Sequence, residues 1–113
     1  MKGNLRLFLE EGGLKTSTRE TGAQWDAPFA WAPLQLRAVE ALESYGYSAE
    51  AREIAGRFTA MVANSFSETG LLLEKYDARR GSGSLEGMIK FGYTTNAPGF
   101  GWTNAVVLEF LNL

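Results

Sequence analysis

The sequence predicts an all-α chain with two long loops, and three observations indicate this fold class. Apolar residues recur at helical spacing over 33–45 and over 49–66, and a third, strongly apolar segment covers 103–112. Glycine, serine, threonine and proline gather in two other stretches, 12–33 and 81–101, which predicts loops there. Loops of this length in a compact domain are usually functional. Three helices are too few to cover their own core, so we expect further chain to pack against them.

The composition is that of one small globular domain. The 113 residues include 45% apolar and 12% aromatic side chains, and the net charge at pH 7 is −2. No basic stripe is present to bind nucleic acid, and no apolar stretch is long enough to span a bilayer. The sequence has no cysteine and no histidine, which excludes disulfides, thiol chemistry and histidine-based triads. Acid–base chemistry must therefore use carboxylates, lysine or tyrosine, and we expect no metal.

The first two predicted helices form a hairpin. Pro33 suits the first turn of the helix over 33–45, and Gly46 marks its end. Ser48 is a candidate N-cap of the helix over 49–66, and the short connection predicts an αα-hairpin. The side chains expected on the buried faces are Ala38, Ala41, Leu42 and Tyr45 in the first helix and Ala51, Ile54, Ala55, Phe58, Val62 and Phe66 in the second.

The two ends of the chain differ in character. Residues 1–23 show no sustained periodicity and are expected to be irregular. The first ten residues do not resemble a signal peptide, so the compartment, periplasm or cytoplasm, stays open. The helix over 103–112 is apolar nearly all round and should be covered on most sides. Thr103 or Asn104 is a candidate cap for its first turn.

The segment 24–35 concentrates two tryptophans, a carboxylate, glutamine and two prolines: Gln-Trp-Asp-Ala-Pro-Phe-Ala-Trp-Ala-Pro-Leu-Gln. An indole face can cover the apolar C–H face of a pyranose, while amide and carboxylate groups bind its hydroxyls. These residue types therefore favour a sugar-binding loop. A structural role for Trp25 and Asp26 is the alternative, because tryptophan often anchors a loop and aspartate often begins a turn.

Glu74 stands at the end of an apolar stretch, Leu71–Leu73, and precedes Lys75, Tyr76 and Asp77. Most glutamates are solvated, so a surface pair with Lys75 is the ordinary interpretation. A fold can instead aim such a carboxylate into a cleft. The residues alone leave both interpretations open.

Three runs, in this order along the chain, resemble the C-terminal part of the trehalases, glycoside hydrolase family 37. They are the segment 24–35, the tetrapeptide 74–77 (Glu-Lys-Tyr-Asp) and the segment 99–104 (Gly-Phe-Gly-Trp-Thr-Asn). The resemblance implies that residues 1–113 are the C-terminal part of a single (α/α)6 barrel domain whose long loops build the active site. It implies hydrolysis of α,α-trehalose to glucose with inversion, without a cofactor. The implied partners are a small disaccharide and the rest of the barrel, which we expect from an N-terminal part.

The resemblance also implies roles for individual residues. Glu74 would be the general base, and the general acid, an aspartate, would lie outside this chain. The 113 residues alone are therefore expected to be inactive. Asp77 is the next candidate for the base. The side chains implied in substrate binding are Gln24, Trp25, Asp26, Tyr76, Tyr93, Phe100 and Trp102; for Phe100 and Trp102 a place in the core is equally open.

The chain departs from the family pattern at two places. Phe29-Ala30 stands where the family commonly has Asn-Gly. Tyr93 stands where a substrate-binding glutamate of a lid is usual, with Glu86 as a substitute from earlier in the loop. The changed lid keeps an α-glucosidase of a related (α/α)6 family, such as family 63, as an alternative to a trehalase. The missing general acid keeps a second alternative, a truncated, non-catalytic sugar-binding chain.

Overall fold

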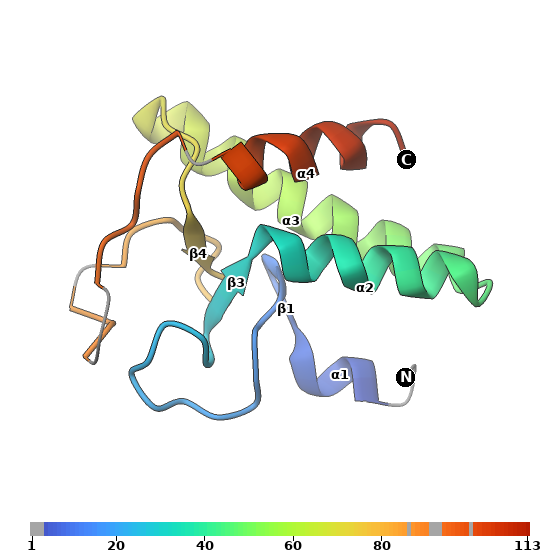
Figure 1. Cartoon of the computed structure of the whole chain (residues 1–113), viewed down its shortest axis with the longest axis horizontal. Helices are drawn as coiled ribbons and strands as arrows, with labels where there is room; N and C mark the ends of the chain where they lie inside the picture. The colour runs from blue at the N-terminus through green and yellow to red at the C-terminus, as the bar shows by residue number, and fades with distance from the viewer. Residues whose placement is uncertain (1–3, 86, 91–93, 100) are drawn as a thin grey trace.

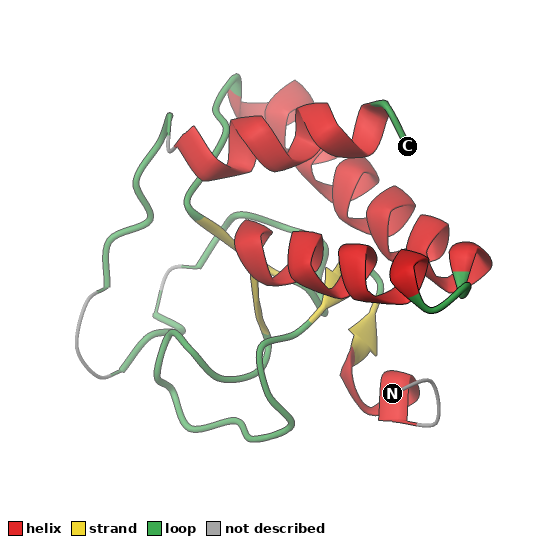
Figure 2. Ribbon diagram, turned by 45° about the vertical axis from the view of Figure 1, so that its right-hand side comes forward, coloured by secondary structure: helices red, strands yellow, loops and turns green. Residues whose placement is uncertain are grey.

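A computed structural model describes residues 4–85, 87–90, 94–99 and 101–113. The elements are α1 (Leu5–Phe8), β1 (Leu9–Glu10), β2 (Gly13–Leu14), β3 (Phe29–Trp31), α2 (Ala32–Ser44), α3 (Ser48–Thr69), β4 (Lys75–Asp77) and α4 (Gly101–Leu111). Among the described residues the helices α2, α3 and α4 are the long elements, and two two-stranded sheets are present. The long helices pack together, and the loops lie to one side of them (Figure 1). The second view confirms that the loops gather at the end where α2 and α4 begin (Figure 2).

The helical hairpin predicted from the sequence is confirmed, with one correction at its turn. Pro33 lies in the first turn of α2. Tyr45 is the C-cap of this helix, and Gly46 follows it with a φ of +82°. The Tyr47 N–H then donates to the Leu42 carbonyl at 2.8 Å, which closes the turn. Ser48 is not the N-cap of α3, because the helix already includes it; its hydroxyl instead donates to Glu43 Oε2 at 3.2 Å.

The buried face of α2 differs from the predicted one, and that of α3 differs only toward its end. In α2 the buried side chains are Ala32, Gln35, Val39 and Leu42. Of the four predicted there only Leu42 is buried, because Ala38 and Ala41 are half-buried and Tyr45 is exposed. In α3 the predicted Ala51, Ile54, Ala55, Phe58 and Val62 are buried, as are Met61 and Ser65. Phe66 is exposed, because the helix turns its Met61 and Ser65 side toward the core over the last turns.

Helix α4 packs on α2 and α3 with one face only. Val106 and Phe110 are buried there, and the Phe110 ring meets Phe58 edge-on with centroids 6.2 Å apart. Leu108 and Leu111 are exposed. Thr103 lies inside this helix rather than at a cap, since α4 begins at Gly101. Within the described residues, no helix combines the length and the apolar character that crossing a membrane requires.

The all-α expectation holds for the long elements, but two short antiparallel sheets interrupt the stretches expected to be irregular. Strand β1 pairs with β2, and β3 pairs with β4, which joins two segments more than forty residues apart. The register of the second pair sets Phe29 opposite Asp77, Ala30 opposite Tyr76 and Trp31 opposite Lys75. Because β3 leads directly into α2, this sheet attaches the loops to the helical half (Figure 1).

Candidate functional site

The extended segment 73–77 is the place where the three distinctive sequence runs meet. Strand β3, from the first run, covers one edge of β4. On the other side, Leu73 forms a bridge with Pro98, and the Leu72 carbonyl accepts a hydrogen bond from the Gly99 N–H at 2.6 Å. Backbone pairing therefore brings residues from far along the chain to the two sides of Glu74.

The third run holds the backbone at Glu74 through two side chains of α4. The indole Nε1 of Trp102 donates to the Glu74 carbonyl at 3.1 Å. The Thr103 hydroxyl donates to the Leu73 carbonyl at 2.6 Å and is itself buried. These contacts give Trp102 and Thr103 a positioning role, and they place Trp102 against the cores on both sides of it.

Glu74 is 5% exposed, so it is not the solvated glutamate that composition alone would favour. Its Oε2 lies 3.3 Å from the Nζ of Lys75, which is 0% exposed. The predicted pair with Lys75 therefore exists but lies inside the protein rather than on its surface, and a cleft at Glu74 stays a prediction. A buried carboxylate beside a buried ammonium is a costly arrangement, because both charged groups lose their hydration.

Lys75 has partners beyond Glu74. Its ammonium donates to the backbone carbonyl of Thr95 and lies 5.1 Å from the centroid of the Trp31 ring. Its backbone N–H donates to Asn96 Oδ1, and its carbonyl accepts from Asn96 Nδ2, both at 3.0 Å. The same Nδ2 group donates to the Gly83 carbonyl at 3.0 Å. Asn96 therefore fastens β4 to both ends of the loop between Gly83 and itself.

The three tryptophans form a continuous aromatic group next to this pair. Trp25 stacks on Trp31 with ring centroids 3.8 Å apart and planes 8° from parallel. Trp102 meets Trp31 edge-on, with centroids 5.6 Å apart. Trp31 is buried, whereas Trp25 is 49% exposed. Trp31 is thus a packing residue, and the Trp25 indole that stacks on it is partly exposed to solvent.

The other two predicted residues of the first loop behave differently from each other. The Gln24 carbonyl accepts from Trp31 Nε1 at 2.8 Å, and its side-chain Oε1 is buried with no hydrogen-bond partner among the described residues. Asp26 faces its own loop, where Ser17 Oγ donates to Oδ1 at 2.8 Å and Thr21 Oγ1 donates to Oδ2. The Thr21 bond, with the Ser17 bond next, lowers the pKa of Asp26 below its ordinary value. Asp26 organises the loop; its contact with a sugar stays a prediction.

Tyr76 lies in the core, edge-on to Phe58 with centroids 6.1 Å apart. Its hydroxyl accepts the Leu73 N–H at 2.9 Å, and burial raises the pKa of the phenol. The structure therefore gives Tyr76 a supporting position beneath segment 73–77, and its role in substrate binding stays a prediction. Tyr93, Phe100 and Glu86, also proposed from the sequence, lie outside the described residues.

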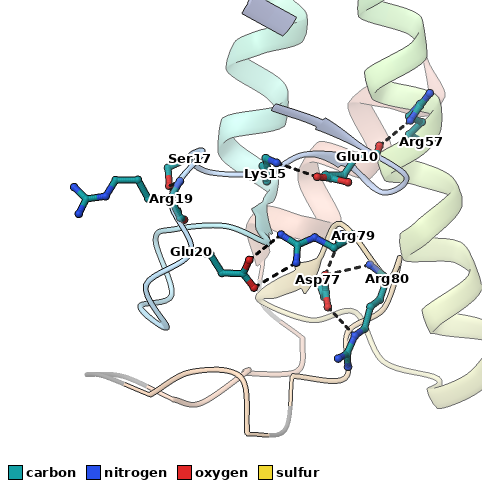
Figure 3. Close-up of polar contacts among 9 residues, drawn as sticks. All are labelled: Glu10, Lys15, Ser17, Arg19, Glu20, Arg57, Asp77, Arg79 and Arg80. Atoms are coloured by element: carbon teal, nitrogen blue, oxygen red, sulfur yellow. Dashed lines mark hydrogen bonds and ion pairs between the residues drawn. The ribbon is translucent and has the colours of Figure 1, made fainter. Parts of the chain in front are cut away.

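Asp77, the second candidate base, is used by the turn that follows β4 (Figure 3). Its Oδ1 accepts the backbone N–H groups of Arg79 and Arg80 at 2.9 and 3.1 Å, and its Oδ2 lies 3.5 Å from Arg80 Nε. Arg79 in turn bonds both carboxylate oxygens of Glu20, at 3.3 and 3.2 Å, which raises the pKa of Arg79. This pair links the first loop to the turn after β4.

Two structural contacts escaped sequence reasoning. Gln35, the last residue of the first run, is fully buried and pairs with the backbone of Leu14: its Oε1 accepts the N–H at 2.8 Å, and its Nε2 donates to the carbonyl at 2.6 Å. Its position on the buried face of α2, three residues after Ala32, was an available signal. The second contact fixes Glu10, whose side chain accepts from Lys15 and whose carbonyl accepts from Arg57, each at 2.9 Å (Figure 3).

Charged groups of the first loop and of the turn after β4 also border a separate cavity of about 320 Å³. Its lining includes Glu20, Thr21, Pro28, Arg80 and Lys90. Glu74 is not among its lining residues. Across the ranges that the structure describes, no cluster of three or more acidic side chains that could ligate a metal ion is found.

Comparison with known proteins identifies relatives for nearly the whole chain. The family model described as Trehalase matches residues 2–113. The periplasmic trehalase of Pseudomonas aeruginosa is 45% identical over 106 residues, which cover 94% of this chain and 19% of that protein. The periplasmic trehalase of Escherichia coli is 42% identical over 107 residues, covering 94% of this chain and 18% of that protein.

A solved structure shares the fold. The neutral trehalase of Saccharomyces cerevisiae superimposes with a TM-score of 0.76 at 34% sequence identity, over 98% of this chain and 19% of that chain. The chain thus spans under a fifth of the length of these relatives.

Proposed function

Because the chain belongs to the trehalase family, we propose that residues 1–113 form the part of an inverting α,α-trehalose hydrolase that contains its general base, Glu74. The observation that carries this proposal is the position of Glu74. A buried carboxylate stands on the second family-like run, which contacts from the first and third runs hold in place. Since the chain spans under a fifth of its relatives' length, we assign the general acid to a part of the barrel outside these residues.

In this proposal Glu74 accepts a proton from a water molecule as the water oxygen attacks the anomeric carbon. The new C–O bond forms while the glycosidic C–O bond breaks, and the leaving oxygen takes a proton from the general acid. The two carboxyl groups of an inverting enzyme stand about 6.5–9.5 Å apart, which leaves room for the water. One α-glucose and one β-glucose therefore result from each molecule of α,α-trehalose.

The geometry supports such a role in two ways. The contacts from Trp102, Thr103 and Asn96 hold the backbone around Glu74, which limits the freedom of its carboxylate. Nearby, the half-exposed ring of Trp25 is suited to a sugar's C–H face, and we propose it as a substrate contact. The Oε1 of Gln24 is buried, so a contact between Gln24 and a sugar stays a prediction.

The rival α-glucosidase function rests on the changed lid, not on the departure from the family pattern at residues 29–30. Phe29 and Ala30, which depart from the family's Asn-Gly, lie in β3 with both side chains buried. Their burial gives a packing reason for the apolar residues at these two positions. A comparison of trehalose with kojibiose and nigerose as substrates separates the two functions, and we expect turnover of trehalose.

The test uses a chimera in which residues 1–113 replace the matching segment of the Pseudomonas aeruginosa periplasmic trehalase. Glu74→Gln should lower kcat about 10²–10⁴-fold, because general base catalysis is lost, with KM for trehalose nearly unchanged. Glu53→Gln, on the exposed side of α3, is the matched control and should keep the parental kcat. Proton NMR of the first products should show equal α- and β-glucose.

Three outcomes contradict the proposal or part of it. Parental kcat in the Glu74→Gln chimera would move the base elsewhere, with Asp77 next to be tested. Two α-glucose molecules per turnover would indicate retention and exclude this mechanism. Hydrolysis of trehalose by the isolated 113-residue chain would show that the acid lies within it.

A further inference from the structure

We propose that Lys75 is the positioning residue of Glu74: its ammonium holds the Glu74 carboxylate and ties its orientation to the loop segment at Thr95. The inference rests on the proposed role of Glu74 as general base and adds a residue that controls it. Lys75 is not assigned to contact the substrate, because its side chain is 0% exposed.

Because the Lys75 ammonium is buried, it must be fixed by partners inside the protein. A charged group inside a protein is stable only when partners replace its lost hydration. Within the described part of the chain, the partners of Lys75 include Glu74 Oε2 at 3.3 Å, the Thr95 carbonyl and the face of Trp31. By contrast, both partners of the Arg37–Glu40 pair on α2 are largely exposed, and such pairs contribute little.

The backbone explains why the two neighbours can meet. In a regular strand, consecutive side chains point to opposite faces and do not touch. Here β4 begins only at Lys75, and the chain bends at Glu74. The backbone of Lys75 is fixed on both edges of β4. On one edge it pairs with Trp31 of β3, and on the other it bonds the side-chain amide of Asn96. A fixed lysine stem next to a bend therefore sets where its ammonium meets the carboxylate.

The contact with Thr95 gives the arrangement a second consequence. The Lys75 ammonium bonds both the carboxylate of Glu74 and the carbonyl of Thr95. Thr95 belongs to the loop that lies along the edge of β4 away from β3. A shift of Thr95 would remove a hydrogen-bond acceptor from Lys75, and the ammonium would then take a different position relative to the Glu74 carboxylate. The orientation of the base and the placement of residues 94–99 are thus set together.

The experiment is a double-mutant cycle in the trehalase chimera, with Lys75→Met as the first variant because methionine keeps the length of the side chain without the charge. A base displaced by about 1 Å can cost about 10²-fold in rate, so kcat should fall by about that factor while KM changes little. Lys15→Met is the matched control, since it removes the Lys15–Glu10 pair, at 2.9 Å, away from Glu74. It should keep the parental kcat.

The second arm adds Lys75→Met to the Glu74→Gln chimera. If Lys75 acts through Glu74, the double variant should have the kcat of Glu74→Gln within about threefold, because the group to be positioned is already gone. This neutral pair also leaves no unpaired buried charge, so it serves the test even where Lys75→Met alone does not fold.

The outcomes separate the two proposals. A tenfold or larger further loss in the double variant, or parental kcat in a folded Lys75→Met, overturns the positioning role while leaving Glu74 as the base. Parental kcat in Glu74→Gln overturns the proposed function itself. A Lys75→Met variant that raises KM as its main effect contradicts the inference, because it indicates a substrate contact.

Discussion

The indole of Trp25 lies parallel to that of Trp31, with ring centroids 3.8 Å apart, although one ring is half exposed and the other is buried. Trp31 sits opposite Lys75 in the sheet, so the stack connects the solvent-facing ring with the buried ion pair beside it. This connection gives the exposed ring a defined plane before any ligand arrives. A flat, oriented indole is suited to the C–H face of a pyranose, and its removal tests that use.

Trp25→Ala should raise KM for trehalose about tenfold in the chimera, which corresponds to about 1.4 kcal/mol of binding free energy. Loss of the stack should lower the free energy of unfolding of the chain by only about 0.5–1.5 kcal/mol, because half of the ring is already in water. Steady-state kinetics and urea unfolding measure the two effects. Trp25→Phe, which keeps a ring, should recover most of the binding. A large loss of stability with unchanged KM would instead assign Trp25 to packing.

Tyr76→Phe should destabilise the chain by about 1–3 kcal/mol, because the buried Leu73 N–H loses its acceptor. It should also change the response to alkali. Burial raises the pKa of Tyr76 above its ordinary 10.0, so the unfolded phenol ionises first. The stability that this group contributes is therefore present below pH 10.0 and is lost as the pH rises through the folded pKa.

Urea unfolding of wild type and Tyr76→Phe at a series of alkaline pH values measures this difference. The wild-type curve should fall more steeply above pH 10.0 than that of Tyr76→Phe. Tyr45→Phe is the control, because Tyr45 is exposed. The free energy of unfolding of this variant should fall with pH as steeply as that of wild type. Parallel curves for wild type and Tyr76→Phe would contradict the prediction.

Asp26→Asn should lower the stability of the chain by an amount that depends on pH. Hydrogen bonds from Thr21 and Ser17 lower the pKa of Asp26 below its ordinary 3.8, so the stabilisation is present above that value. It is lost as the pH falls through the lowered folded pKa, because protonation weakens the carboxylate's bonds. Thermal unfolding should separate wild type from Asp26→Asn near neutral pH, with the gap closing in strong acid. A gap of constant size at every pH would refute this account.

The helices were predictable because their signals are local. Apolar spacing and the glycine at 46 depend on residues within one or two turns, and α2 and α3 form as predicted to within a few residues. The exposure of Tyr45 and Phe66 was not predictable in the same way. A stripe read from the sequence shows which residues share a face, but the partner elements decide where along the helix that face is covered.

The sheets and the site depended on contacts between distant segments. Pairing of β3 with β4 joins Trp31 to Lys75, and neither segment has an alternation long enough to indicate a strand. The sequence runs did single out Glu74, Trp25 and Trp102. Their mutual arrangement, including the Trp102 bond to the Glu74 carbonyl, required the fold, because no local pattern specifies a contact across 28 residues.

The amide of Asn96 closes the chain between Gly83 and itself by bonding the Gly83 carbonyl and both backbone groups of Lys75. Two ends that share one clamp can remain in place while the residues between them change. Replacement of Asn96 should therefore release Gly83 and the strand at Lys75 together, because one side chain holds both.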